Sequence, residues 1–314
     1  GTQMATSEGR QRWAMVSKYR VVPRCFGRYR WADDEPLSAE IEEVCVATNT
    51  LPYEDYLECR SLALTMGLFY QDRILFELYG FLRHFGVRPS ALLSILHAKR
   101  MSLGAGIADL YHSFNRQTHE ELWDSFEDLE RFTRSRQDVI DRYVAGELGN
   151  NVLFRHRAIA FLELMGDIHG AAYRHARDIL SGIDAAIPVR YGDYLDELRA
   201  FSELRKRDLF ELRTEYTRTF EYDFEALMAD EFRSLPQPAV SPVEVRFRPT
   251  ERQTSMLEDQ LYVQGRDLNG ISKIISRIPV AKLQRAVEFG TSGGLVGVDQ
   301  GVQFSSPTPL SPGE

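Results

Sequence analysis

The chain has 314 residues, of which 43% are hydrophobic and 27% are charged, an ordinary composition for a soluble globular protein. Its formal net charge of −8 argues against general binding to nucleic acid or to anionic membranes. The longest apolar stretch, residues 62–70, has about half the length that a bilayer-spanning helix needs. We therefore expect neither a nucleic-acid partner nor a membrane span.

The first sixty residues predict part of a sheet rather than a complete one. Residues 18–29 have an extended pattern, and the continuous apolar run of residues 44–47 is typical of a strand covered on both faces. Polar Thr48 and Asn49 follow that run, and a helix begins directly after them. One such βα unit cannot close a sheet or bury both of its faces. Because the sequence also opens on Gly1, without an initiator methionine, we expect the C-terminal part of a larger enzyme.

Most of the middle of the chain has helical periodicity. The pattern predicts an apolar helix that should be central in the fold, followed by four amphipathic or charged helices. Thr118 and Glu121 have the spacing of a capping box at the start of one of them. The expected helices cover residues 53–84, 89–102, 118–143, 151–181 and 191–212.

One face of the expected helix 151–181 carries side chains that are able to bind a metal ion. His156, Glu163 and Asp167 share this face, but a carboxylate-bridged metal site needs ligands that converge from facing helices. The face also carries Arg174 and lies opposite the apolar stripe. We therefore expect it to be exposed to solvent.

The pattern changes near residue 217, where apolar and charged residues begin to alternate. The alternation at 220–224 predicts a strand, with a helix as the alternative, and the alternation at 243–247 predicts a second strand. Thr250 and Gln253 form a capping box for a helix that ends near Gly265. Two shorter helices are expected at 271–278 and 280–287, and a disordered tail at 291–314.

The predicted fold class is therefore α+β and predominantly α-helical, with the terminal strands of a partial (β/α) barrel followed by a helical C-terminal domain. We expect four regions, which are the end of the barrel at 1–60, a helical domain at 61–234, a small module of a strand and helices at 235–290, and the tail at 291–314.

The three cysteines, Cys25, Cys45 and Cys59, are widely spaced and form no CxxC or CxxxCxxC motif. Because local zinc and iron–sulfur sites need closely spaced thiolates, no metal site is expected within this chain. Reduced, mostly buried thiols are the expected state, and they are typical of a cytoplasmic protein.

Basic residues recur at Arg20, Arg24, Arg28 and Arg30, on alternate positions or nearly so. They either line the mouth of an anion-binding site or protect an edge strand by their charge. The sequence leaves both interpretations open.

Several blocks of the chain together resemble one enzyme family. Residues 18–29, 42–60, 220–224 and 271–287 look like the C-terminal region of radical SAM enzymes that have a cobalamin-binding domain. The resemblance implies an N-terminal cobalamin-binding domain, then a partial (β/α) barrel, then a helical extension. It also implies S-adenosylmethionine and a [4Fe-4S] cluster as cofactors of the intact enzyme, and it leaves open whether cobalamin is used as well.

The chain departs from that family in one decisive motif, the cluster-binding CxxxCxxC, which is absent. This polypeptide alone should therefore neither bind the cluster nor cleave S-adenosylmethionine. The expected partners are the missing barrel and cobalamin-binding domain, together with a small-molecule substrate.

The resemblance places residues 18–60 at the mouth of the barrel, which faces substrate and cofactor. The candidate binding residues are Arg24, Glu42, Thr48, Asn49 and Arg60. The two arginines would hold a carboxylate or a phosphate, while Thr48 and Asn49 would form hydrogen bonds with cofactor or substrate. Capping of the following helix is the alternative role for Thr48 and Asn49.

The leading hypothesis is thus a fragment of a radical SAM enzyme that, when intact, performs radical chemistry on an unidentified substrate. The alternative hypothesis is a helical scaffold or interaction protein without catalytic activity.

Overall fold

The computed structural model describes residues 3–28, 37–135 and 137–290, and the tail expected at 291–314 lies outside them. In this part of the chain, fourteen α-helices accompany two small antiparallel sheets, which confirms the α+β, predominantly helical class. None of these helices is long and apolar enough to span a bilayer. The helices are α1 (Ser7–Arg12), α2 (Tyr53–Phe69), α3 (Phe76–Arg83), α4 (Pro89–Ala98), α5 (Ala105–Glu120), α6 (Phe126–Ser135), α7 (Gln137–Val144), α8 (Val152–Glu163), α9 (Met165–Ile183), α10 (Ala186–Arg190), α11 (Gly192–Lys206), α12 (Phe224–Ala229), α13 (Glu251–Gln264) and α14 (Leu268–Ile275). The strands are β1 (Val16–Arg28), β2 (Leu37–Ala47), β3 (Tyr216–Tyr222), β4 (Pro238–Arg248) and β5 (Ala286–Phe289).

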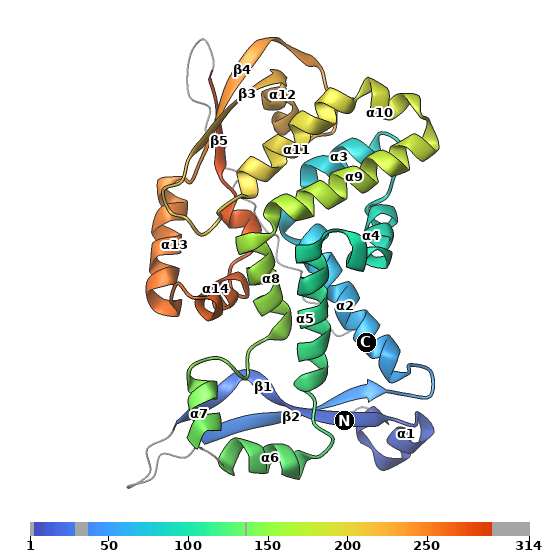
Figure 1. Cartoon of the computed structure of the whole chain (residues 1–314), viewed down its shortest axis with the longest axis vertical. Coiled ribbons are helices and arrows are strands. Elements are labelled where there is room, and N and C mark those ends of the chain that lie inside the picture. The colour runs from blue at the N-terminus through green and yellow to red at the C-terminus, as the bar shows by residue number, and fades with distance from the viewer. Residues whose placement is uncertain (1–2, 29–36, 136, 291–314) are drawn as a thin grey trace, which may run out of the picture.

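Strands β1 and β2 form a hairpin at one end of the molecule, with α6 and α7 beside it (Figure 1). The two strands run antiparallel, with Val21 opposite Ile41. Strands of a (β/α) barrel are parallel and need a crossover of a dozen or more residues, whereas β2 begins nine positions after β1 ends. The two strands expected to belong to a barrel therefore pair with each other. Their inner face packs on a small core made of Val21, Leu129, Val139 and Tyr143.

The main core lies in the rest of the molecule, where the helices pack on one another and on the sheet β3–β4–β5. Phe201 of α11 stacks on Phe224 with ring centroids 4.4 Å apart and meets Phe247 of β4 edge-on. Strand β3 lies before the boundary expected at residue 235 and β4 lies after it, so this sheet joins the two regions.

The helix expected at 53–84 is divided into α2 and α3 by a turn without glycine or proline. Asp72 and Arg73 in this turn have φ angles of +55° and +59°. The Asp72 carboxylate accepts a hydrogen bond of 2.9 Å from the Val280 N–H and also pairs with Arg157. Partners that are distant in sequence thus hold the break, which explains why local periodicity does not predict it.

The helix expected at 118–143 is also interrupted. Thr118 lies buried inside α5 instead of capping a helix, so that prediction is wrong. The chain turns after α5 because Trp123 pairs with Tyr19 of β1 through two backbone hydrogen bonds of 2.7 and 2.8 Å. A third break, at Leu164, separates α8 from α9.

The C-terminal predictions have mixed outcomes. The capping box of Thr250 and Gln253 is confirmed, with both of its hydrogen bonds present. The helix expected at 280–287 is wrong, because a 3₁₀ turn at Val280–Leu283 leads into β5, which pairs with β4. The strand expected at 220–224 ends at Tyr222 of β3, and α12 begins at Phe224.

The face of His156, Glu163 and Asp167 is only partly exposed. Both carboxylates are exposed, but His156 is fully buried, which corrects the expectation of a solvated face. Its Nδ1–H donates to the Val152 carbonyl at 2.8 Å, and its Nε2 then accepts from the Ser113 hydroxyl at 3.3 Å. Because both ring nitrogens have partners inside the protein, the burial of His156 leaves neither unsatisfied.

Candidate functional site

Two of the predicted residues, Glu42 and Arg60, are linked through Arg20 of the hairpin and Glu121. Arg20 on β1 lies opposite Glu42 on β2, and its Nε is 2.6 Å from Glu42 Oε1. Glu121 follows the last residue of α5, and its Oε1 accepts a hydrogen bond of 2.7 Å from Arg20 Nη1. Arg60 Nη2, from α2, lies 3.7 Å from the same oxygen. We call Arg20, Glu42, Arg60 and Glu121 the hairpin charge cluster.

The hairpin charge cluster is balanced and half-buried. Burial raises the pKa of Glu121, although Arg20 and Arg60 act in the opposite direction. Burial alone would lower the pKa of Arg20, but Glu121 and Glu42 outweigh it, so that this pKa is raised. Two guanidinium groups and two carboxylates form the cluster, so its charges cancel.

The side chain of Arg24 extends from β1 toward α14 and forms hydrogen bonds there. Its Nη1 and Nη2 donate to the hydroxyls of Ser276 and Ser272 at 2.8 and 3.0 Å. Burial and the nearby Arg277 lower the pKa of Arg24. Its φ of +66° is held by a backbone hydrogen bond of 2.8 Å to the Gly149 carbonyl. Arg24 is therefore a structural clamp between hairpin and α14.

Thr48 and Asn49 lie at the other end of β2, where they shape the turn into α2. The Thr48 hydroxyl accepts from the Leu51 N–H at 3.1 Å, and the Asn49 N–H donates to the Trp13 carbonyl at 2.9 Å. The N-cap of α2 is Pro52, so Thr48 caps a turn and not the helix. The five predicted residues thus occupy three separate places. Of the four basic positions, Arg20 and Arg24 have the roles given above, while the Arg28 side chain and Arg30 lie outside the described part of the chain.

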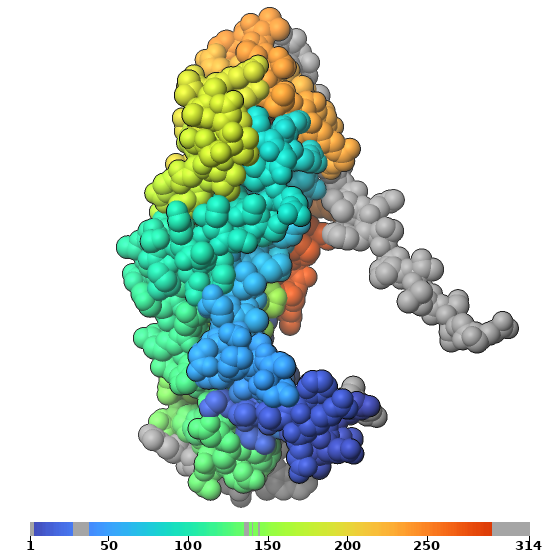
Figure 2. Space-filling model, turned by 90° about the vertical axis from the view of Figure 1, so that its right-hand side faces the viewer, coloured from blue at the N-terminus to red at the C-terminus, as the bar shows by residue number. Residues whose placement is uncertain are grey.

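A pocket of about 340 Å³ opens beside the hairpin charge cluster. Its walls come from β1, the end of α5, the turn after it, the helices α6 and α7, and the start of α8. We call it the hairpin pocket. In the space-filling view, the hairpin and the α6–α7 region form the foot of the molecule below α2 and α5 (Figure 2). Arg20 and Glu121 of the hairpin charge cluster line the pocket.

Aromatic and aliphatic side chains form much of the pocket wall. Trp123 and Phe132 lie with ring centroids 4.8 Å apart, and Tyr143 packs edge-on against Phe26. Burial raises the pKa of Tyr143 to about 12, so its phenol stays neutral at physiological pH. Val152 and Leu129 extend this apolar surface.

The residues missed by sequence reasoning include Trp123, Glu121 and Arg155, all of which line the pocket. They lie after the first sixty residues, to which the resemblance confined the site. The turn after α5 and the start of α8 bring them to the hairpin. A usable signal was the large aromatic Trp123 between two polar stretches, since such a residue in a turn often fills a pocket.

The residues of this chain do not fit an iron–sulfur cluster. Cys25 and Cys45 are half-buried in β1 and β2, and Cys59 is exposed on α2, which corrects the expectation of mostly buried thiols. Cys25 precedes Phe26, whose partner Ala39 lies six positions along β2 from Cys45, so the two cysteines are about 20 Å apart along the hairpin. Among the described residues, no group of three or more histidine, cysteine or carboxylate side chains is placed to hold a metal ion.

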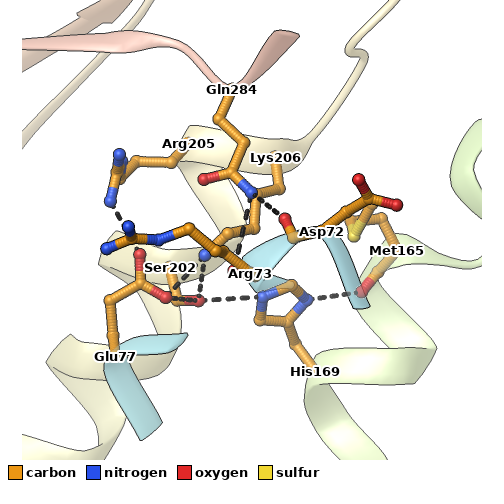
Figure 3. Close-up of polar contacts among 9 residues, drawn as sticks. All are labelled: Asp72, Arg73, Glu77, Met165, His169, Ser202, Arg205, Lys206 and Gln284. Atoms are coloured by element: carbon orange, nitrogen blue, oxygen red, sulfur yellow. Dashed lines mark hydrogen bonds and ion pairs between the residues drawn. The ribbon is translucent and has the colours of Figure 1, made fainter. Parts of the chain in front are cut away.

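A second polar cluster lies in the main core, between α3, α9 and α11 (Figure 3). Lys206 Nζ donates to Glu77 Oε2 at 2.6 Å, and Arg205 Nη1 donates to Glu77 Oε1 at 2.8 Å. The Ser202 hydroxyl lies 2.9 Å from Glu77 Oε2 and 3.1 Å from Nε2 of His169. His169 Nδ1–H donates to the Met165 carbonyl at 2.9 Å. We call Glu77, His169, Ser202, Arg205 and Lys206 the core charge cluster.

Glu77, His169, Ser202 and Lys206 of the core charge cluster are fully buried and Arg205 is 18% exposed, and the pKa values of the cluster follow from this burial. Burial alone would raise the pKa of Glu77, but Lys206 and Arg205 outweigh it and lower this pKa to about 2. Burial lowers the pKa of Lys206 to about 8 against the attraction of Glu77. Burial, aided by the charge of Lys206, lowers the pKa of His169 to about 3. Each of these groups bonds to another protein group, so the cluster stabilises the packing of three helices.

Comparison with protein-family models found no match, and a search of the curated proteins found none either.

Proposed function

We propose that this chain is the C-terminal region of a radical SAM enzyme of the cobalamin-binding type, and that the hairpin pocket receives the substrate. The observation that supports the proposal is the position of the pocket. Arg20 and Val21 of β1 line it and belong to residues 18–29, one of the segments that carry the family resemblance. Arg20 also pairs with Glu42, and its partner Glu121 lies near Arg60, so two of the predicted binding residues stand next to the pocket.

In this proposal, the chain's own residues bind and orient the substrate. Arg20 and Glu121 fix the polar wall of the pocket, and Trp123 with Phe132 supplies the apolar wall. The [4Fe-4S] cluster would be held by residues outside this chain, because its three cysteines do not converge. The family resemblance implies that S-adenosylmethionine and any cobalamin would also bind to the preceding part of the intact enzyme. The bound cofactors would supply the radical chemistry, while this region would supply substrate positioning.

The experiment that tests the proposal begins with the genomic sequence that encodes this chain. An in-frame CxxxCxxC upstream of residue 1 is expected. The complete open reading frame, reconstituted with iron and sulfide under anaerobic conditions, should then form 5′-deoxyadenosine from S-adenosylmethionine when reduced with dithionite.

The matched control is the same protein with the three cysteines of that motif replaced by alanine, which should form no 5′-deoxyadenosine. An open reading frame that starts at or near Met4, with no cysteine motif in it, would overturn the proposal. So would a reconstituted protein with a full cluster that never cleaves S-adenosylmethionine.

One observation favours the second candidate, a scaffold or interaction protein without catalytic activity. Leu62, Met66 and Tyr70 follow one another at intervals of four residues along α2 and its C-cap, and their exposed fractions are 39%, 38% and 47%. An exposed apolar stripe of this kind is typical of a helix that packs on another protein. An open reading frame without the cysteine motif would favour this candidate.

A further inference from the structure

We propose that the hairpin pocket binds an aryl carboxylate, a small molecule with a flat ring system and one carboxylate group. The inference names the substrate class of the enzyme proposed above and rests on that function for its biological meaning. Binding itself depends only on residues of this chain, so it is tested without cluster or S-adenosylmethionine.

The size and apolar wall of the pocket select the ring system. A volume of about 340 Å³ lies at the lower end of the range of small-molecule pockets, which is about 300–1,000 Å³. Trp123 and Phe132 are tilted by 38° to each other, and Leu129, Val152 and Tyr143 complete the apolar surface. A flat ring buries apolar area against these side chains and forms edge or face contacts with the aromatic ones.

The charges at the pocket select an anion. Four arginines of the described part of the chain line the pocket, and three of them are neutralised by glutamates. Arg20 pairs with Glu121 at 2.7 Å, Arg142 with Glu147 at 3.2 Å, and Arg116 with Glu120 at 3.9 Å. Three ion pairs of this kind leave the pocket wall close to neutral.

Arg155 is the fourth arginine, and it differs from the other three. Its Nη1 donates to the neutral side-chain oxygen of Asn269 at 2.9 Å, and among the described residues it makes no ion pair. A guanidinium group that is held in place by an amide and faces a pocket is suited to bind a carboxylate through paired N–H donors.

The start of α8 adds to the same preference. Asn150 and Val152 line the pocket, and the side chain of the N-cap Asn151 accepts the Phe154 N–H. The first N–H groups of a helix have no acceptor within the helix, and the helix dipole favours an anion at this end. Arg155 and the start of α8 therefore reinforce each other.

The same charges limit the ligand to one negative charge. Glu120 and Glu147 stand at the pocket with exposed fractions of 62% and 61%, and Glu121 lies deeper in the wall. Their carboxylates would repel a phosphate dianion, which one unneutralised arginine does not balance. A monoanionic carboxylate matches the single guanidinium group.

The test is a calorimetric titration of the full chain with three probes that share one ring system. Indole-3-acetate is the anion, 3-methylindole is neutral, and tryptamine is the cation. We expect indole-3-acetate to bind, 3-methylindole to bind at least tenfold more weakly, and tryptamine to give no heat above dilution.

Variants locate the binding in the pocket. Arg155→Gln should weaken the binding of indole-3-acetate at least tenfold and leave that of 3-methylindole unchanged, whereas Arg155→Lys should retain part of the preference for the anion. Trp123→Leu should weaken both ligands. Arg233→Gln is the matched control, because Arg233 is 67% exposed and pairs with Glu231 away from the pocket. Circular dichroism establishes that each variant is folded.

Three results would overturn the inference. They are the absence of binding of indole-3-acetate at millimolar concentration, equal affinity for indole-3-acetate and tryptamine, and unchanged affinity in Arg155→Gln. If Arg155→Gln does not fold, the affinities of the unmodified chain for the three probes decide whether the pocket prefers an anion. Binding without 5′-deoxyadenosine formation by the intact reading frame would reject the catalytic proposal alone.

Discussion

The core charge cluster and the hairpin charge cluster both pair carboxylates with basic side chains, but the central pair of the core cluster is more deeply buried. Glu77 and Lys206 are fully buried, whereas the side chains of Arg20 and Glu42 are 18% and 37% exposed. In the core, each charged group is fixed by another protein group. At the hairpin, Arg20 and Glu121 border a pocket that solvent reaches.

The difference separates a structural role from a binding role. A buried charge that loses its partner has no water to replace it, so a dry cluster must keep its partners. A half-exposed charge beside a pocket exchanges partners at low free-energy cost, because water or a ligand substitutes for the lost group. This difference supports our proposal that the hairpin binds a ligand, whereas the core cluster has a structural role.

Replacement of Glu77 should break the fold most severely. Glu77→Gln keeps the shape of the side chain but leaves the buried ammonium group of Lys206 without its counter-charge. The expected loss is about 3–5 kcal/mol in the free energy of unfolding, measured by urea denaturation. The matched control, Asp128→Asn, removes a pair that is 72% and 56% exposed, and should change that free energy by less than about 0.5 kcal/mol.

A double variant separates the lost pair from general damage at this position. Glu77→Leu combined with Lys206→Met removes both charges and should recover much of the stability that the single change loses. Equal losses for Glu77→Gln and Asp128→Asn would contradict the distinction between the two clusters.

The second prediction concerns pH and the buried histidine of the core charge cluster. An unfolded histidine has a pKa of about 6.5, and the pKa of the folded His169 is lowered to about 3. Between these values the unfolded chain binds more protons, so the contribution of His169 is complete above pH 6.5 and is lost as the pH falls. The slope is about 1.4 kcal/mol per pH unit, hence about 2 kcal/mol between pH 6.5 and 5.

The measurement compares the stability of His169→Gln with that of the unmodified chain at pH 7.5, 6.5 and 5 in urea. The variant should lose about 2 kcal/mol less between pH 6.5 and 5. His156, whose pKa burial lowers to about 4, acts in the same direction and remains in both proteins. The exposed His112 supplies the control variant His112→Gln, and an equal change of slope in the two variants would count against a dry core.

The sequence predicts the fold class because helical periodicity and alternation are local signals. It predicts the capping box at Thr250 for the same reason. It misses the turn at Asp72, which depends on Arg157 and on the Val280 N–H far along the chain. It also misses β5, a strand of only four residues that is stabilised by its pairing with β4. The turn at Asp72 and strand β5 both depend on partners that are distant in sequence, so local sequence patterns do not predict them.

For the candidate site, the sequence indicates Glu42 and Arg60 but not the residues that join them. Arg20 lies opposite Glu42 only because β1 and β2 are antiparallel, whereas the expected parallel barrel would separate them. Arg155 reaches the pocket because α8 begins next to the hairpin, more than a hundred residues after β1. The spacing of these residues in the sequence does not predict that Arg20 lies opposite Glu42 or that Arg155 lies at the pocket.

Replacement of Glu42 has the smallest expected effect, and it tests whether the hairpin charge cluster tolerates the loss of a partner better than the core charge cluster does. Glu42→Gln removes a half-exposed carboxylate that accepts one hydrogen bond from Arg20 at 2.6 Å. Because Arg20 keeps Glu121 and water reaches the site, the free energy of unfolding should fall by about 0.5 kcal/mol or less in urea denaturation at pH 7. Loss of several kcal/mol would mean that the hairpin cluster is as intolerant as the core cluster. The hairpin would then be a structural element, and the pocket beside it would have no freedom to exchange an internal partner for a ligand.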